Sequence, residues 1–408
     1  MKYNITLFFI FLSLSAQQKS SEHKSYNFII VDSPAVLFTM RQINQDYLSG
    51  YRLFAKTTTS LVKNKNLANM IQAGFQLLLF LPTTHEEGHR SVLTVHNIGS
   101  ISQPFFNMQG AAYVKGVHDE TLKKLRDTNL PTFIRLHTAG IESDYMLTKR
   151  VETIASFEED EFNNLKWEYW GRKYAIIQYF VMGLFNYEVG MKEETDELER
   201  DIVGHDIYGA VRHLCRPNMN FYRYTDYNDL TEEEKHLVHR FGYRSLLNFL
   251  NPLIIGKANY RLNKNTRFNF GLGYALSPFG DFIDENVWIK NNRFNLYFYV
   301  RQYQNKHNWF HAFGIGLYNF QISKKWQIDM IGHFWQQPLN FNFNTDKYFT
   351  GAAFDGNAKY WFYDSQNVLM KKVGLNFGFL YKTNGFLPEE LYLKEHLGIR
   401  LGLSFLLK

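Results

Sequence analysis

The segment PTTHEEGHRSVL, Pro82–Leu93, has a spacing that could bind a metal ion, because His85, Glu86 and His89 form the pattern H-E-x-x-H. If the segment is helical, His85 and His89 lie four residues apart on one face, and both imidazoles can reach a single ion. Glu86 lies one step round the helix and can take a proton from a water whose pKa the metal has lowered. Pro82 is tolerated at a helix start, so the pattern predicts a helix that carries a hydrolytic metal site.

The string HEEGH resembles the HExGH form found in zinc metallopeptidases of the zincin type. In the gluzincin families, the third zinc ligand is a glutamate on a later helix, often followed closely by an aspartate. The segment TAGIESDYMLTKR, Thr138–Arg150, resembles that stretch, because it offers Glu142 and Asp144. Ala139 and Gly140 would let another helix pack closely against it.

This resemblance implies Zn²⁺ held by both histidines of the motif and by Glu142, with Glu86 as the general base. The identity of the third ligand stays open, because Asp144 and His118 are alternatives to Glu142. Zincins also use a further His or Tyr to stabilise the oxyanion, and the segment GHDIYGAVRHLC offers His205 and Tyr208 for that role. A structural role in helix packing is the alternative for each of these two residues.

The elements that must position these residues are mostly helical between about Ser25 and Leu250. LANMIQAGFQLLLFL, Leu67–Leu81, is shorter than a spanning helix and is expected to be a buried core helix. Farther along, Thr231 and Glu234 have the spacing of a capping box and predict a helix start.

After about Asn251 the apolar residues alternate with a period of two, which is typical of strands. About eight such segments follow, most of them long enough to cross a membrane as tilted strands. The even strand count, the 17% aromatic content and a strand that runs to the C-terminus resemble an outer-membrane β-barrel of the smallest class. The residues expected to face outward include Phe270, Leu272, Phe298, Phe377 and Leu401. The alternative is a soluble barrel or sandwich with this apolar face inside.

The first sixteen residues resemble a secretory signal peptide, with Lys2, an apolar run from Ile5 to Leu12 and small residues up to Ala16. Cys215 is the single cysteine, so no intramolecular disulfide can form, and export to the periplasm or outer membrane is favoured over a small disulfide-rich scaffold. The net charge of +6 is spread along the chain without a long basic block, which argues against a nucleic-acid partner.

The sequence therefore predicts an α+β chain of two parts. Residues 17–250 form a helical, zincin-like metallopeptidase domain facing the periplasm, and residues 251–408 form an outer-membrane barrel in contact with lipid. On this interpretation the protein is a zinc peptidase of the cell envelope that cleaves a protein or peptide substrate. The competing hypothesis is a non-enzymatic barrel protein with a helical partner-binding domain and an incidental or degenerate HExxH.

Overall fold

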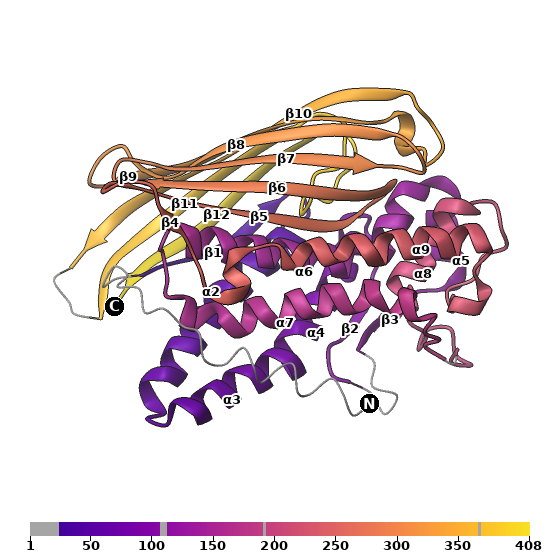
Figure 1. The fold of residues 1–408 in the computed structure, drawn as a ribbon, viewed down its shortest axis with the longest axis horizontal. Coiled ribbons are helices and arrows are strands. Elements are labelled where there is room, and N and C mark those ends of the chain that lie inside the picture. The colour runs from indigo at the N-terminus through magenta and orange to yellow at the C-terminus, as the bar shows by residue number, and fades with distance from the viewer. Residues whose placement is uncertain (1–23, 107–111, 191–192, 366–368) are drawn as a thin grey trace.

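The fold was analysed in a computed structural model, which describes residues 24–106, 112–190, 193–365 and 369–408 (Figure 1). The expected signal peptide lies outside the described residues. The chain combines helices in its N-terminal half with one large antiparallel sheet that is built mainly from its C-terminal part.

The helices begin where the sequence offers caps. Thr39 accepts a hydrogen bond from the Gln42 amide, and Thr231 with Glu234 forms the capping box that the sequence predicted. α6 is the longest helix and runs through the centre of the helical part (Figure 1). The helices are α2 (Met40–Leu61), α3 (Lys65–Phe75), the π-helical turn η2 (Gln76–Phe80), α4 (Leu81–Val95), α5 (Asp119–Thr128), α6 (Leu130–Ser156), α7 (Phe162–Val181), α8 (Asp206–Cys215), α9 (Glu232–Ser245) and the 3₁₀ turns η3 (Met182–Phe185), η4 (Tyr227–Asp229), η5 (Leu246–Phe249), η6 (Pro252–Ile255) and η7 (Leu339–Phe341).

The main sheet has ten strands in the order β1-β12-β11-β10-β9-β8-β7-β6-β5-β4, and a separate pair is formed by β2 and β3. Sequential strands are neighbours, except that the first strand pairs with the last, Lys24 opposite Leu407. The strands are β1 (Lys24–Ser33), β2 (Ile101–Gln103), β3 (Tyr113–Lys115), β4 (Tyr260–Arg261), β5 (Thr266–Ser277), β6 (Gly280–Asn291), β7 (Asn295–Gln304), β8 (Trp309–Gln321), β9 (Trp326–Pro338), β10 (Tyr348–Asp364), β11 (Met370–Lys382) and β12 (His396–Leu407).

The sheet is open, so the expected closed barrel of about eight strands is not what the structure shows. Within the described ranges, β1 and β4 pair on one side only. Helix α2 covers the other edge of β1: Asp46 accepts from the Ile29 amide at 2.6 Å, and Ser49 accepts from the Asn27 amide at 3.2 Å. Backbone groups that a closing strand would satisfy are thus bonded to a helix, which removes the need for closure.

The opposite edge is covered in the same manner. Beyond the short β4, Asn248 accepts from the Tyr274 amide and donates to its carbonyl, and the Leu272 amide donates to the Leu250 carbonyl. Both edges therefore end against the helical part of the chain. The strands that the sequence did not predict are β1, which comes from the N-terminal region, and β6. The segment expected to be a strand from about Ile254 forms the turn η6 and only the two-residue β4.

The sheet places its apolar side chains on the outside. Phe270, Phe298, Phe377 and Leu401 are between 41% and 47% exposed, and Leu272 is partly exposed. The face that covers the helices carries buried charged side chains such as Asp284, Arg301 and Arg400 among buried aromatic ones, unlike that of an ordinary soluble sheet. The expectation that these apolar residues point outward agrees with the structure, although the barrel does not close.

The inner face of the sheet meets α6 through a buried ionic cluster. Asp284 of β6 accepts two hydrogen bonds from Arg301 at 2.6 and 2.8 Å, one from Lys149 at 3.1 Å and one from the Tyr145 hydroxyl. Helices α6 and α7 run beside the strands under the arch of the sheet (Figure 1). The helical part is consequently not a separate body beneath the strands.

The segment Leu67–Leu81, expected to be a buried core helix, has the opposite arrangement. It forms α3, η2 and the start of α4, and Leu67, Met70, Phe75 and Leu78 are exposed. The inward face is taken by polar residues that find partners there. No helix in the described part of the chain has both the length and the hydropathy needed to cross a membrane.

Candidate metal centre

Helix α4 presents the two motif histidines to a close crossing with α6. A Cβ on Gly88 would lie 2.5 Å from the Ala139 carbonyl oxygen, so this glycine allows the two helices to approach. A Cβ on Gly140 would lie 2.4 Å from His85 Nε2 and 2.5 Å from His89 Nε2. Both imidazoles therefore point their Nε2 atoms into the space that Gly140 leaves open.

The third member of the cluster is Asp206, the first residue of α8. Its carboxylate lies 3.1 Å from His85 Nε2 and 3.5 Å from His89 Nε2, and all three side chains are buried. The three ligand atoms lie within 4.8 Å of one another, so this group could hold a metal ion. Ligand atoms around a tetrahedral zinc lie roughly 3.3–3.6 Å apart, which the two observed distances resemble.

Hydrogen bonds to the other ring nitrogens fix both imidazoles. His89 Nδ1 lies 2.6 Å from the Leu136 carbonyl oxygen, which can only accept, so Nδ1 carries a proton. His85 Nδ1 lies 2.8 Å from Asp144, whose other oxygen accepts from Arg172. With Nδ1 held by these acceptors, each ring can present an Nε2 lone pair to a metal once the Nε2 proton has left, as metal-binding histidines do.

The charges of the cluster depend on one another. Burial would raise the pKa of Asp206, but His89 and His85 outweigh it and hold the pKa well below its usual range. Burial would lower the pKa of His85, yet Asp144 and Asp206 raise it well above the usual value. A cation between these groups would replace the imidazole protons, so metal binding and proton release are coupled here.

Glu86 lies on the same helix but outside the ligand triangle. Its side chain is buried, and burial raises the pKa of its carboxyl to about 6. The positive charges of His85 and His89 act in the opposite direction, while the negative charge of Asp206 acts with burial. A carboxyl with this pKa can accept and return a proton near neutral pH, which is the role that the sequence predicted for it.

The expected third ligand, Glu142, is not in this cluster. Its carboxylate is held by Arg135, with contacts of 3.0 and 2.6 Å, and accepts from the Glu389 amide at 2.8 Å. Arg135 also donates to the Glu390 and Leu387 carbonyls. Glu142 therefore fastens the β11–β12 loop to α6, and Asp206 stands where Glu142 was expected.

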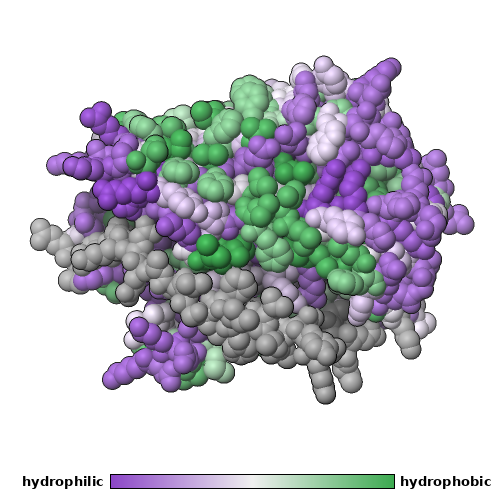
Figure 2. All heavy atoms as spheres, in the orientation of Figure 1, coloured by the Kyte–Doolittle hydropathy of each residue, from purple (hydrophilic) through white to green (hydrophobic). Residues whose placement is uncertain are grey.

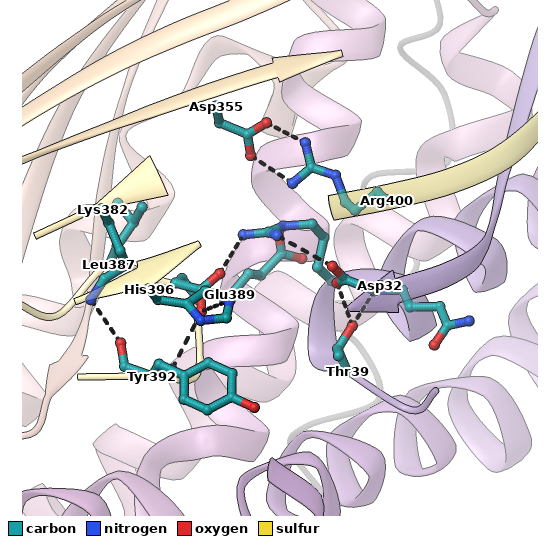
Figure 3. Close-up of polar contacts among 12 residues, drawn as sticks. Asp32, Thr39, Asp355, Lys382, Leu387, Glu389, Tyr392, His396 and Arg400 are labelled. Atoms are coloured by element: carbon teal, nitrogen blue, oxygen red, sulfur yellow. Dashed lines mark hydrogen bonds and ion pairs between the residues drawn. The ribbon is translucent and has the colours of Figure 1, made fainter. Parts of the chain in front are cut away.

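Figure 3 shows the surroundings of this loop. Lys382 donates to the Tyr392 carbonyl at 2.8 Å, and the Tyr392 ring stacks on His396 with centroids 4.2 Å apart. Arg400 of β12 binds Asp355 of β10, across the intervening β11. These contacts belong to the junction between sheet and helices and not to the histidine cluster.

The two alternative third ligands have other positions. Asp144 contacts the ring of His85 through Nδ1, so it orients a ligand and does not complete the triangle. His118 caps α5, is largely exposed and pairs with Glu197 at 2.6 Å. It lies outside the cluster.

The two residues expected to stabilise an oxyanion, His205 and Tyr208, differ in whether they have a free hydrogen-bond donor. The Tyr208 hydroxyl donates to the Tyr187 carbonyl at 2.9 Å, so its proton is already used. His205 caps α8, and its Nδ1 accepts from the Tyr208 amide at 3.3 Å. Burial lowers the pKa of His205 to about 4, so the neutral ring carries its proton on Nε2, which is buried without a partner.

Two residues of the site were not assigned from the sequence. Asp206 is adjacent to His205 at a helix start, where acidic residues are common, so its type and place gave no distinct signal. Tyr179 of α7 stacks on His85 with ring centroids 5.1 Å apart, and burial and the charges of Asp206 and Glu86 raise its pKa well above the usual value. No spacing in the sequence links α7 to α4.

Comparison of the chain with protein-family models, with curated proteins and with solved structures gives no match.

Proposed function

We propose that the protein is a zinc-dependent hydrolase that cleaves peptide bonds in a protein or peptide substrate. The observation that carries the proposal is the convergence of His85 Nε2, His89 Nε2 and an Asp206 oxygen, with Glu86 beside them. Two neutral imidazoles and a carboxylate are a ligand set that zinc uses in catalytic sites with an open fourth position. The resemblance of HEEGH to zinc metallopeptidases supports peptide hydrolysis as the reaction.

In this proposal, bound zinc acts as a Lewis acid that lowers the pKa of a water and polarises the scissile carbonyl. Glu86 takes the proton from the attacking water and passes it to the leaving amine. Asp144 and the Leu136 carbonyl hold the two imidazoles in the tautomer that leaves Nε2 free. The unpartnered Nε2–H of His205 is the candidate donor to the oxygen that becomes negative in the transition state.

The test compares Glu86→Gln with Glu87→Gln in the purified chain. Glu87 is the neighbouring glutamate and pairs with Arg90, so its substitution controls for a lost charge on the same helix. Wild type and both variants should hold about one zinc per chain, and Glu86→Gln alone should lower peptide turnover by about 10²–10⁴.

Absence of bound zinc in the wild type, or equal activity of both variants, would contradict the assignment. The non-enzymatic envelope protein would then be the better hypothesis.

We also propose that the protein is exported and that its sheet faces outer-membrane lipid. The exposed side chains of the sheet support this, because its exposed Trp and Tyr lie near the two ends of the strands, while exposed Phe, Ile and Leu occur along their whole length. At one end the exposed Trp and Tyr are Trp309, Tyr348 and Tyr381, and at the other Trp326 and Tyr363.

At the end of the sheet where β12 finishes, the strands are joined by short turns, and these turns then face the periplasm. Because the helices run beside the strands, only one end of the helical part can face the periplasm (Figure 1). Fractionation of expressing cells tests the location: the chain should stay with outer membranes after salt washing and leave them in detergent. Recovery of the mature chain in the soluble fraction would refute it.

A further inference from the structure

The helical segment α3–η2 has its polarity inverted in the same sense as the sheet. Gln72 is buried and donates to the Ala55 carbonyl, and Gln76 is buried and accepts from the Tyr47 hydroxyl at 2.9 Å. The side chains that face away from the protein are Leu67, Met70, Phe75 and Leu78, which are 47–71% exposed. In a helix that packs on a water-soluble protein, the leucines would be inside and the glutamines outside.

The surroundings of this face limit what can cover it. From Asn66 to Thr84 the chain contains no Asp, Glu, Lys or Arg, so the segment has no charge that could pair with a protein partner. α3 packs on α2 and α7 and lies on the side of the molecule opposite the sheet (Figure 1). The two inverted surfaces therefore lie on opposite sides of one helical core.

Apolar groups also occupy the surface between them. Leu246, Phe249, Leu250 and Ile255, in and around η5 and η6, are 42–57% exposed, and they follow α9 along the edge of β5. Figure 2 shows hydrophobic groups running from the sheet across the middle of this face, with hydrophilic groups at both the left and the right ends. A band of this kind, bounded by polar ends, matches a slab of hydrocarbon better than a single docking patch.

We propose that the outward face of α3–η2 is embedded in the hydrocarbon of a phospholipid bilayer, so that the helical core lies within the membrane beside the sheet. The inference rests on the proposed membrane location of the sheet and extends it to the helices. Lipid acyl chains are the occupant because they satisfy apolar side chains without hydrogen bonds or charges, and Gln72 and Gln76 each direct their side chain to a partner inside the protein.

One consequence concerns the substrate class of the metal centre. α4 follows η2 without a break, and His85 lies seven residues after the exposed Leu78, about 10 Å along a helix. If Leu78 contacts lipid, the histidine cluster lies within or next to the membrane. Its substrate would be a peptide segment held at or in the membrane and not a freely diffusing peptide.

The experiment places a fluorophore at single positions of the full chain reconstituted in phosphatidylcholine vesicles. In a Cys215→Ser background, Met70→Cys and Leu78→Cys report the α3–η2 face, Phe334→Cys reports the sheet, and Glu120→Cys on α5 reports water. Each is labelled with an environment-sensitive dye. Quenching is compared between lipids carrying a doxyl group on the acyl chain and aqueous iodide.

We expect positions 70, 78 and 334 to lose most of their fluorescence with doxyl lipids and little with iodide, and position 120 to do the reverse. If position 334 is quenched by lipid but 70 and 78 by iodide, the inference on α3–η2 is overturned and the membrane location of the sheet survives. If 70 and 78 resist both quenchers, another protein or a second copy covers them, which also overturns it. If position 334 is quenched only by iodide, the proposed location itself fails.

Discussion

A single methyl group at Gly140 should weaken metal binding without replacing a ligand. In Gly140→Ala the new Cβ would lie 2.4 Å from His85 Nε2 and 2.5 Å from His89 Nε2, and Cβ contacts under 3.0 Å essentially never occur. The rings must therefore move by at least 0.6 Å (3.0 − 2.4) and 0.5 Å (3.0 − 2.5). Metal–ligand distances tolerate only about 0.2 Å, so the displacement exceeds what the ligand geometry allows.

The expected loss of zinc affinity is at least about 10–100-fold, the range seen when residues that orient ligands are removed. The assay is competition with a chromogenic chelator, with circular dichroism to verify the fold. Alanine favours a helix over glycine by about 1 kcal/mol, so helix content should not fall. Gly50→Ala in α2 is the matched control, because nothing lies within 4 Å of a Cβ there. Wild-type affinity in Gly140→Ala would show that the two imidazoles do not converge beside Gly140.

Three further outcomes follow from other contacts. Asp206→Asn should lower the zinc content. Glu142→Gln should keep zinc but lower the unfolding free energy by about 3–5 kcal/mol, because it breaks a buried ion pair. Loss of zinc in Glu142→Gln and its retention in Asp206→Asn would instead identify Glu142 as the ligand. Burial would raise the pKa of Asp284, but Arg301 and Lys149 outweigh it and lower the pKa, so its stabilisation is present above pH about 3.9 and is lost as the pH falls further. The unfolding temperature should drop more steeply below that pH in wild type than in Asp284→Asn, and parallel curves would exclude this cluster as the cause. Asp46→Ala should speed hydrogen exchange at the Ile29 amide, and an unchanged rate would mean that α2 does not protect the edge of β1.

Seven strands, β5 and β7 to β12, and their outward residues could be predicted from the sequence because alternation depends only on neighbours along the chain, whereas β1 and β6 were missed. Closure could not, since it depends on what meets the two edges. Asp46, Ser49 and Asn248 bond to those edges from helices, and no local pattern marks a helical side chain that will replace a strand.

At the metal centre, His85 and His89 were predictable because both lie on one helix with a fixed spacing. The third group comes from a helix that begins 117 residues after His89, since 206 − 89 = 117. Glu142 fitted the resemblance by distance along the chain, but Arg135, about two turns earlier on the same face of α6, pairs with it. The choice between two carboxylates was decided by tertiary packing, which the spacing of residues does not contain.

The pairing of β1 with β12 sets when the protein can finish folding. Lys24 lies opposite Leu407, so the contact joins the two ends of the described chain and has nearly the largest sequence separation possible within it. During synthesis, β1 has no strand partner until β12 has left the ribosome, and β11 must wait unpaired at that edge. A nascent chain of this kind depends on a holding chaperone more than one built from local hairpins alone. Deletion of β12 would therefore leave both β1 and β11 without a strand partner at that edge.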